Sequence, residues 1–186
     1  MTHAATEAAT AAAAPAPAPA VSGAKTLLLV YHTLTGGTLQ MARAAADGAA
    51  EEPALCTLLR HAPDATAADV LCADGYVFAT PENLAAMSGL MKDFFDRTYY
   101  AALGRVEGRP YAVLVCAGSD GSNAVRQIER IATGWRLKAV APALIVCTHA
   151  QTPEQILGAK RIGADDLQRC RDVGAALAAG LALGVF

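Results

Sequence analysis

From residue 25 onward, short and nearly continuous apolar runs alternate with segments in which apolar residues recur every three or four positions. A run of about four to eight apolar residues between turn residues is typical of a buried strand, whereas the three-to-four spacing indicates a helix with one buried face. The runs predict five strands, over residues 26–31, 54–59, 75–79, 111–116 and 137–146, with Pro142 interrupting the fifth. The periodic segments predict helices over residues 38–50, 66–72, 87–103, 122–134 and 165–183, the fourth of them capped by Ser122.

Strands that alternate with helices in this way predict an α/β fold in which helices cover both faces of a parallel sheet. Ligands of such open sheets bind beyond the carboxyl ends of the strands, where the strand order reverses. Three predicted loops follow strand ends and are rich in Thr, Ser, Asn or Gly: residues 33–38, 80–86 and 117–121. We therefore expect these three loops to form one binding site.

The first of these loops has the composition of an anion site: Thr33-Leu34-Thr35-Gly36-Gly37-Thr38. Because it joins a predicted strand to a helix, its N–H groups, the unpaired N–H groups of the first helical turn and three threonine hydroxyls can converge on one anion. No Lys or Arg lies between Lys25 and Arg43, so we expect neutral donors to hold the anion. This favours a phosphate monoester on a bound cofactor over a reacting triphosphate, which usually needs a loop lysine and a metal ion.

Other doubly wound families do not fit the residues that follow the strands. The first loop lacks the G-x-G-x-x-G of dinucleotide-binding Rossmann domains and the G-x-x-x-x-G-K of P-loop NTPases. The first and third strands end in Tyr31-His32 and Ala79-Thr80, where a phosphoryl-accepting receiver domain needs acidic residues. The segment 118–122 departs from the G-x-S-x-G of serine hydrolases, and no cysteine or histidine pair has metal-ligand spacing.

The first loop and the strand before it, over residues 29–38, resemble the FMN-phosphate signature T-x-T-G-x-T of the flavodoxin family. Thr80-Pro81-Glu82-Asn83, followed by Met87-Ser88-Gly89 and by residues 92–96, is similar to the second flavin loop and following helix of the NAD(P)H-dependent flavin and quinone reductases of that fold. These reductases include the tryptophan-repressor-binding-protein type. The resemblance covers about residues 25–150. It implies a three-layer, doubly wound flavodoxin-like fold with a five-stranded parallel sheet in the order 2-1-3-4-5.

The same resemblance implies FMN as cofactor, NAD(P)H as co-substrate and a quinone or similar small molecule as electron acceptor. It implies no catalytic side chain, because the flavin carries the chemistry, and we expect His32 to be a loop histidine bonded to backbone rather than a general acid. A homodimer or tetramer is expected, built on the helix over residues 87–103. The implied cofactor-binding residues are Thr33, Leu34, Thr35, Gly36, Gly37, Thr38, Thr80, Pro81, Glu82, Asn83, Leu84, Ala117, Gly118, Ser119 and Gly121.

One departure from the family leaves other functions open. Leu84-Ala85-Ala86 stands where many relatives carry an aromatic residue and a glycine, and neither the second nor the third loop supplies an aromatic ring to stack on a flavin. An isoalloxazine ring would touch Leu84 and backbone, with one face open to a nicotinamide or quinone. A flavodoxin-type electron carrier without direct NAD(P)H activity, and a flavin-free binding module of the same fold, remain the alternatives.

Composition completes the picture. The chain has 186 residues, enough for one domain, and its low-complexity Ala/Pro segment over residues 1–22 predicts a disordered arm before a domain over residues 23–186. A net charge of −2 without a Lys/Arg cluster predicts no nucleic-acid partner, and no apolar run predicts a membrane span. We expect the five cysteines to be small core residues in a reducing cytosol, which makes the expected location cytoplasmic.

Overall fold

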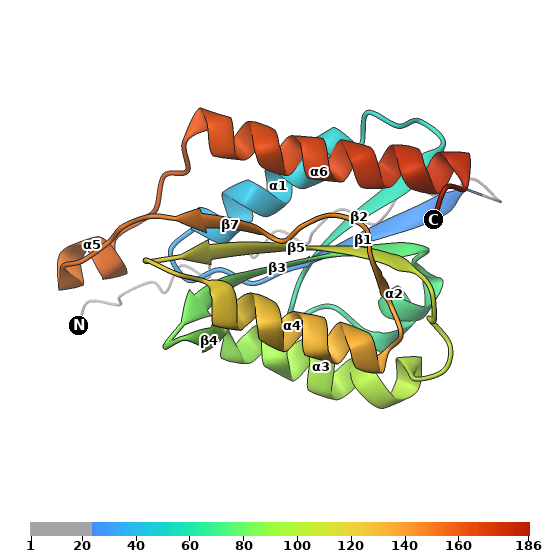
Figure 1. Cartoon of the computed structure of the whole chain (residues 1–186), viewed down its shortest axis with the longest axis horizontal. Coiled ribbons are helices and arrows are strands. Elements are labelled where there is room, and N and C mark those ends of the chain that lie inside the picture. The colour runs from blue at the N-terminus through green and yellow to red at the C-terminus, as the bar shows by residue number, and fades with distance from the viewer. Residues whose placement is uncertain (1–23) are drawn as a thin grey trace, which may run out of the picture.

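Strands and helices alternate along the chain as the apolar pattern predicts (Figure 1). The computed structural model describes residues 24–186, and the predicted arm over residues 1–22 lies outside the described residues. The strands are β1 (Lys25–Tyr31), β2 (Leu55–His61), β3 (Gly75–Asn83), β4 (Ala86–Met87), β5 (Pro110–Ala117), β6 (Lys138–Ala139) and β7 (Leu144–Cys147). The helices are α1 (Gly37–Ala49), α2 (Ala67–Cys72), α3 (Gly89–Ala102), α4 (Ser122–Gly134), α5 (Pro153–Leu157) and α6 (Ala164–Leu183).

The strands form one sheet with the spatial order β2-β1-β3-β5-β6. Both β6 and β7 pair with β5, and all pairings are parallel except that of the short β4 with β3. The predicted fifth strand is therefore two strands, and Pro142 lies between them because it has no N–H to donate to a sheet ladder. With β6 and β7 taken together as the fifth strand, the predicted order 2-1-3-4-5 is confirmed.

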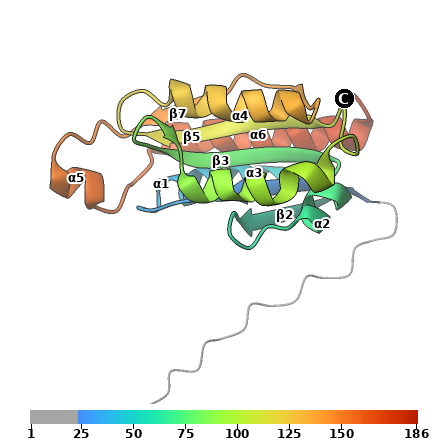
Figure 2. The ribbon, with the colours of Figure 1, turned by 90° about the horizontal axis from the view of Figure 1, so that it is seen from below.

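Helices cover both faces of the sheet and give the fold three layers (Figure 2). Leu27 and Leu29 of β1 pack toward α1 and α6, whereas Leu28 and Val30 pack toward α2, α3 and α4. All four side chains are fully buried. A central strand of a covered parallel sheet buries both of its faces, which explains why its sequence is a continuous apolar run.

Two glycines let α1 and α6 pack backbone against backbone. A Cβ atom on Gly48 of α1 would lie 2.1 Å from the carbonyl oxygen of Arg171, and one on Gly174 of α6 would lie 1.8 Å from that of Ala45. Neither position can take a larger residue without moving the helices apart. This contact fixes α1, and with it the loop that precedes α1, on its face of the sheet.

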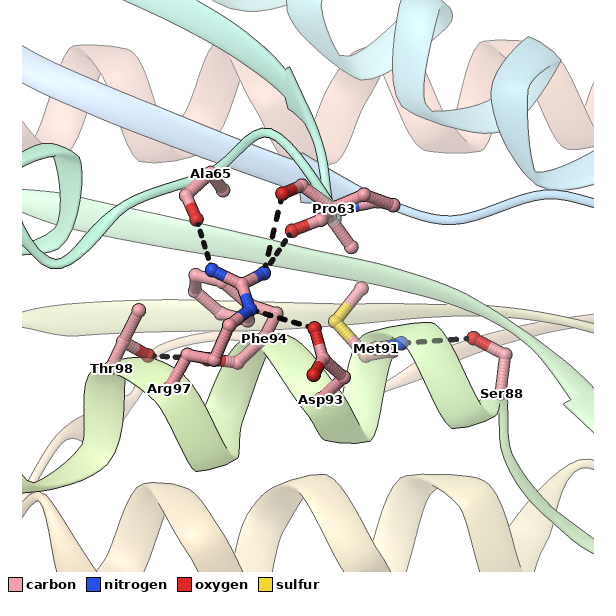
Figure 3. Close-up of polar contacts among 9 residues, drawn as sticks. Pro63, Ala65, Ser88, Met91, Asp93, Phe94, Arg97 and Thr98 are labelled. Atoms are coloured by element: carbon pink, nitrogen blue, oxygen red, sulfur yellow. Dashed lines mark hydrogen bonds and ion pairs between the residues drawn. The ribbon is translucent and has the colours of Figure 1, made fainter.

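Arg97 of α3 holds the segment after β2 against that helix (Figure 3). Its Nη2 and Nη1 atoms donate to the carbonyl oxygens of Ala62 and Ala65 at 2.8 and 2.9 Å, and its Nε donates to Asp93 one turn earlier at 2.7 Å. At the start of α3, the Ser88 hydroxyl accepts from the N–H of Met91 at 3.3 Å and caps the helix. These contacts fix the position of α3 directly after the second predicted loop.

The predicted loop over residues 80–86 is wrong, because the chain forms a β-hairpin there. Glu82 pairs with Met87 and Asn83 with Ala86, and the turn between them consists of residues 84 and 85. Leu84 and Ala85 have left-handed φ angles of 51° and 59°. A two-residue hairpin turn of type I′ requires positive φ at both of its central residues. The usual Asn-Gly signal for such a turn is missing from the sequence, which is why the hairpin was not predicted.

The structure differs from the sequence analysis at two further places. Gly121, with φ of 84°, precedes α4 as its cap residue, so Ser122 begins the helix and donates its hydroxyl hydrogen to Asp120 at 2.7 Å. The short helix α5 was not predicted, although Thr152 and Gln155 form a capping box there.

All five cysteines are free. Cys116 and Cys170 are buried as predicted, whereas Cys72 at the end of α2 is exposed. Burial raises the pKa of the Cys170 thiol to about 12, so this thiol stays neutral and behaves as an apolar core residue. None of the helices between residues 24 and 186 combines the length and apolarity that crossing a membrane requires.

Candidate cofactor-binding site

A cavity of about 530 Å³ lies where the three predicted loops meet, within the usual size range of ligand pockets. It opens beyond the carboxyl ends of β1, β3 and β5, the end of the sheet from which α5 also extends (Figure 1). The predicted residues that line it are Thr33, Leu34, Thr35, Thr38, Pro81, Glu82, Asn83, Leu84, Ala117, Gly118 and Ser119. The residues that sequence reasoning missed are Ala85, Cys116, Thr148, Ala150, Ile156, Leu157 and Lys160.

The first loop presents donors that have no partner within the protein. Gly36 is left-handed, with φ of 84°, and donates its N–H to the Thr33 hydroxyl at 3.0 Å, which closes the turn before α1. Among residues 24–186, the N–H groups of Gly37 and Thr38 in the first turn of α1 have no recorded acceptor. The hydroxyl of Thr38 is buried and has no hydrogen-bond partner among these residues, and the Cys116 thiol lies beside it. These groups fit a phosphate, which would accept from all of them.

Lys160 brings a positive charge to the cavity that the local sequence does not contain. The backbone N–H of Lys160 donates to the carbonyl oxygen of Thr35 at 2.8 Å. The side-chain amide of Gln40 donates to the carbonyl oxygens of both Lys160 and Gly36. The ammonium group of Lys160 donates to three carbonyl oxygens at the end of α5, those of Gln155, Ile156 and Gly158. The expectation that neutral donors would hold an anion at the first loop stays a prediction, and Lys160 is a cation whose backbone is bonded to that loop.

The second loop is held in place by residues of the third loop and of α4. The Glu82 carboxylate accepts from the N–H of Gly121 at 2.9 Å, and Gln127 accepts from the N–H of Met87 at 2.9 Å. The Asn123 amide donates to the carbonyl oxygen of Ala85 at the hairpin tip. The hairpin is thus a positioned wall of the cavity rather than a free loop.

Four of the predicted binding residues do not line the cavity: Gly36, Gly37, Thr80 and Gly121. Gly36 and Gly121 form the left-handed turns before α1 and α4, and Gly37 packs against Cys116 and Lys160. Thr80 is fully buried, where its hydroxyl accepts from the N–H of Ser88 at 3.1 Å. These residues shape the loops instead of facing a ligand.

Exposed aliphatic side chains gather on the rim of this cavity. Leu34 is 69% exposed and Leu84 is 102% exposed, and α5 contributes Ile156 at 52% and Leu157 at 80%. No aromatic residue lines the cavity among residues 24–186. The site therefore combines a polar end at the first loop with an aliphatic rim, which suits a ligand with a phosphate at one end and a flat apolar ring at the other.

His32 does not line this cavity, and its Nδ1 atom is buried without a partner among the described residues. The expected bond from its side chain to backbone is therefore wrong for this atom. Burial, together with the nearby His61 ring at a centroid distance of 5.6 Å, lowers the pKa of His32. Burial likewise raises the pKa of the Cys116 thiol. Neither group is prepared for acid–base work in the cavity.

Comparison with known proteins agrees with this geometry. Residues 60–151 match the family described as NADPH-dependent FMN reductase. Over this segment, which is just under half of its length, the chain is similar to the NADPH-dependent FMN reductases. The matched segment of this family contains the second and third loops and ends within the residues that lead to α5.

Individual proteins with flavodoxin or quinone-reductase names are also similar to this chain. A flavodoxin of Aquifex aeolicus is 37% identical over 94 residues, which cover 50% of this chain and 49% of that protein, so the chain matches about half of its length. An NAD(P)H dehydrogenase (quinone) of Acidithiobacillus ferrooxidans is 25% identical over 170 residues, covering 77% of this chain and 83% of that protein. The crystal structure of a WrbA-like flavodoxin from Agrobacterium tumefaciens shares the fold, with a TM-score of 0.66, 20% identity and coverage of 87% and 99%.

Proposed function

We propose that this protein is an FMN-dependent oxidoreductase that takes electrons from NAD(P)H and passes them to a quinone or a similar small acceptor. One observation carries the proposal: the buried hydroxyl of Thr38, which has no partner among residues 24–186, belongs to a residue that lines the same cavity as the exposed aliphatic side chains. A single cavity thus offers donors for a phosphate and an apolar surface for a ring. The similarity of residues 60–151 to NADPH-dependent FMN reductases supports an oxidoreductase that uses flavin.

When bound, FMN would supply the hydride and electron transfer. The chain would bind the FMN phosphate through the first loop, with Thr38 and the first-turn N–H groups as donors and Lys160 nearby as a cation. The hairpin residues 81–84 and the third-loop residues 117–119 would orient the ring and exclude water from part of it. No side chain of the cavity is assigned a proton-transfer role.

A titration of the purified protein with FMN tests the binding step. We expect FMN fluorescence to be quenched and its visible absorption bands to shift as it leaves water. Riboflavin, which lacks the phosphate, is the matched ligand and should bind more weakly because the first loop is left without its anion. A protein that binds no added FMN would overturn the proposal.

Anaerobic mixing with NADH and with NADPH tests the electron source. We expect one or both to bleach the visible absorption of the FMN-loaded protein, and a quinone to restore it. The name of the Acidithiobacillus relative, NAD(P)H dehydrogenase (quinone), supports this choice of substrates. Loading with FMN but no reaction with either nucleotide would favour the second candidate, an electron carrier, which the Aquifex relative named flavodoxin supports.

We further propose that the protein works as a homodimer or tetramer in the cytoplasm. α3 carries two exposed apolar residues, Leu90 and Tyr100, and the exposed Leu103 follows its last residue, with Tyr100 84% exposed. Exposed apolar side chains on and next to one helix favour contact with another chain. Light scattering on the purified protein measures the mass, and a monomer at micromolar concentration would contradict this part of the proposal.

A further inference from the structure

The connection between β7 and α6 passes in front of the proposed cofactor site. We call residues 148–160 the strap; they contain α5 and lie beyond the carboxyl ends of the strands (Figure 2). None of the residues of α5 is buried. The strap is therefore not held in place by a hydrophobic core, and its position must have another cause.

Hydrogen bonds within the strap make it a self-supporting unit. Thr152 and Gln155 form a reciprocal capping box at the start of α5, with the Gln155 N–H donated to the Thr152 hydroxyl at 3.3 Å. Lys160 closes the other end, because its ammonium group donates to carbonyl oxygens of the last turn. A helix of five residues is marginal without such caps.

Both ends of the strap are bonded to the loops of the proposed site. At its start, Thr148 and His149 donate their N–H groups to the carbonyl oxygens of Ala117 and Gly118 at 2.9 and 2.8 Å. At its end, Lys160 donates to Thr35 of the first loop. The strap thus bridges the third loop and the first loop across the cavity mouth.

The two faces of α5 have different chemistry and face different cavities. Ile156 and Leu157 line the proposed cofactor cavity, as do Leu84 of the hairpin and Leu34 of the first loop. Glu154 and Gln155 line a second cavity of about 580 Å³, together with Arg161 and Asp166. Single exposed aliphatic residues are ordinary, but several that converge on one cavity indicate a surface that a ligand covers.

We propose that Ile156 and Leu157 are cofactor-binding residues that, with Leu84, form the apolar wall against the ring of bound FMN. This proposal rests on the proposed function, since it requires FMN in the cavity. The strap would supply the apolar contact that no aromatic side chain of the cavity provides. Because its ends are bonded to the first and third loops, FMN held by these loops would meet the strap without a large movement of the chain.

The double variant Ile156→Ser, Leu157→Ser tests the wall by FMN titration. Both side chains are exposed, so the fold should not depend on them, which a thermal melt without FMN verifies. We expect the Kd for FMN to rise about tenfold or more, because apolar contact with the ring is lost. The matched control is Leu183→Ser, Val185→Ser, which removes two exposed aliphatic residues that lie outside the cavity and should leave the Kd unchanged.

Hydrogen exchange of the wild-type protein independently tests whether bound FMN contacts α5. We expect added FMN to slow exchange of the amide groups over residues 153–158, since the ring would restrict the opening of α5. The inference would be overturned, and the proposed function left standing, if the wild-type protein bound FMN, the double serine variant had the same Kd and FMN did not change exchange in the strap. Wild-type protein that binds no FMN would overturn both.

Discussion

Gly37 lies so close to Cys116 that a Cβ atom on the glycine would come within 2.7 Å of the thiol sulfur. The same added Cβ atom would also lie 3.2 Å from the Cβ atom of Lys160. The first residue of α1 is thus enclosed between the end of β5 and the end of the strap. The φ angle of Gly37 is not left-handed, so the requirement for glycine at this position is one of space alone.

We predict that Gly37→Ala lowers the free energy of unfolding by about 1–3 kcal/mol, because the added methyl group overpacks this contact. Adding Cys116→Ala should recover part of the loss, since it removes the nearest clashing atom. Urea denaturation of the two single variants and the double variant measures the coupling. The control is Gly89→Ala at the start of α3, where an added Cβ meets nothing within 4 Å. Independent, additive effects of Gly37→Ala and Cys116→Ala would contradict the prediction.

Thr38→Val should separate cofactor binding from stability. It removes a buried hydroxyl that has no partner among the described residues, so the cofactor-free protein should be as stable as the wild type or more stable. FMN affinity should fall by about 1–3 kcal/mol for the lost charge-assisted hydrogen bond, and Thr35→Val in addition should lower it further. Denaturation without FMN and titration with FMN give the two quantities.

Thr57→Val is the matched control for this prediction. The Thr57 hydroxyl in β2 is also buried without a partner among residues 24–186, but Thr57 does not line the cavity. Its replacement should affect stability in the same direction and leave FMN affinity unchanged. Equal FMN affinity of Thr38→Val and the wild type would mean that the phosphate binds elsewhere.

The parts of the fold that were predicted correctly depend on local sequence patterns. A strand buried on both faces must be apolar throughout, so β1 is readable from residues 27–30 without knowledge of its neighbours. The first loop could be predicted as an anion site because several threonines and glycines between a strand and a helix are typical of such a site. The hairpin was missed because Leu84 and Ala85 adopt left-handed angles that their side chains disfavour.

The parts of the site that were missed depend on contacts between distant segments. Lys160 is bonded to Gln40, 120 residues away in the sequence, and no local pattern reveals that pairing. The strap carries a readable capping box, Thr152 with Gln155, but its five helical residues are too few for apolar periodicity. Its position across the cavity follows only from the bonds at its two ends.

Ala85→Gly should stabilise the protein, because Ala85 has a φ of 59° that glycine adopts without steric penalty. The left-handed conformation costs a residue with a side chain about 1–2 kcal/mol, and the greater chain entropy of glycine offsets about 0.5–1 kcal/mol of this. We expect a net gain of about 0.5 kcal/mol in the free energy of unfolding. Ala86→Gly, one residue later in β4, should instead destabilise, since that residue is not left-handed. Destabilisation by both changes would contradict the strain at the hairpin tip.

Stability should fall as the pH drops below about 6.5, and His32 should account for part of this fall. Burial and the neighbouring His61 lower the pKa of His32 from 6.5, so the unfolded chain takes up a proton at this histidine before the folded chain does. The stabilisation is complete above the unfolded-state pKa and is lost as the pH falls from there to the folded-state pKa. Urea denaturation between about pH 4.5 and 7.5 should therefore give a shallower slope for His32→Gln, by up to about 1.4 kcal/mol per pH unit. His149→Gln, at an exposed position of the strap, is the control, and equal slopes for His32→Gln and the wild type would show that His32 does not contribute.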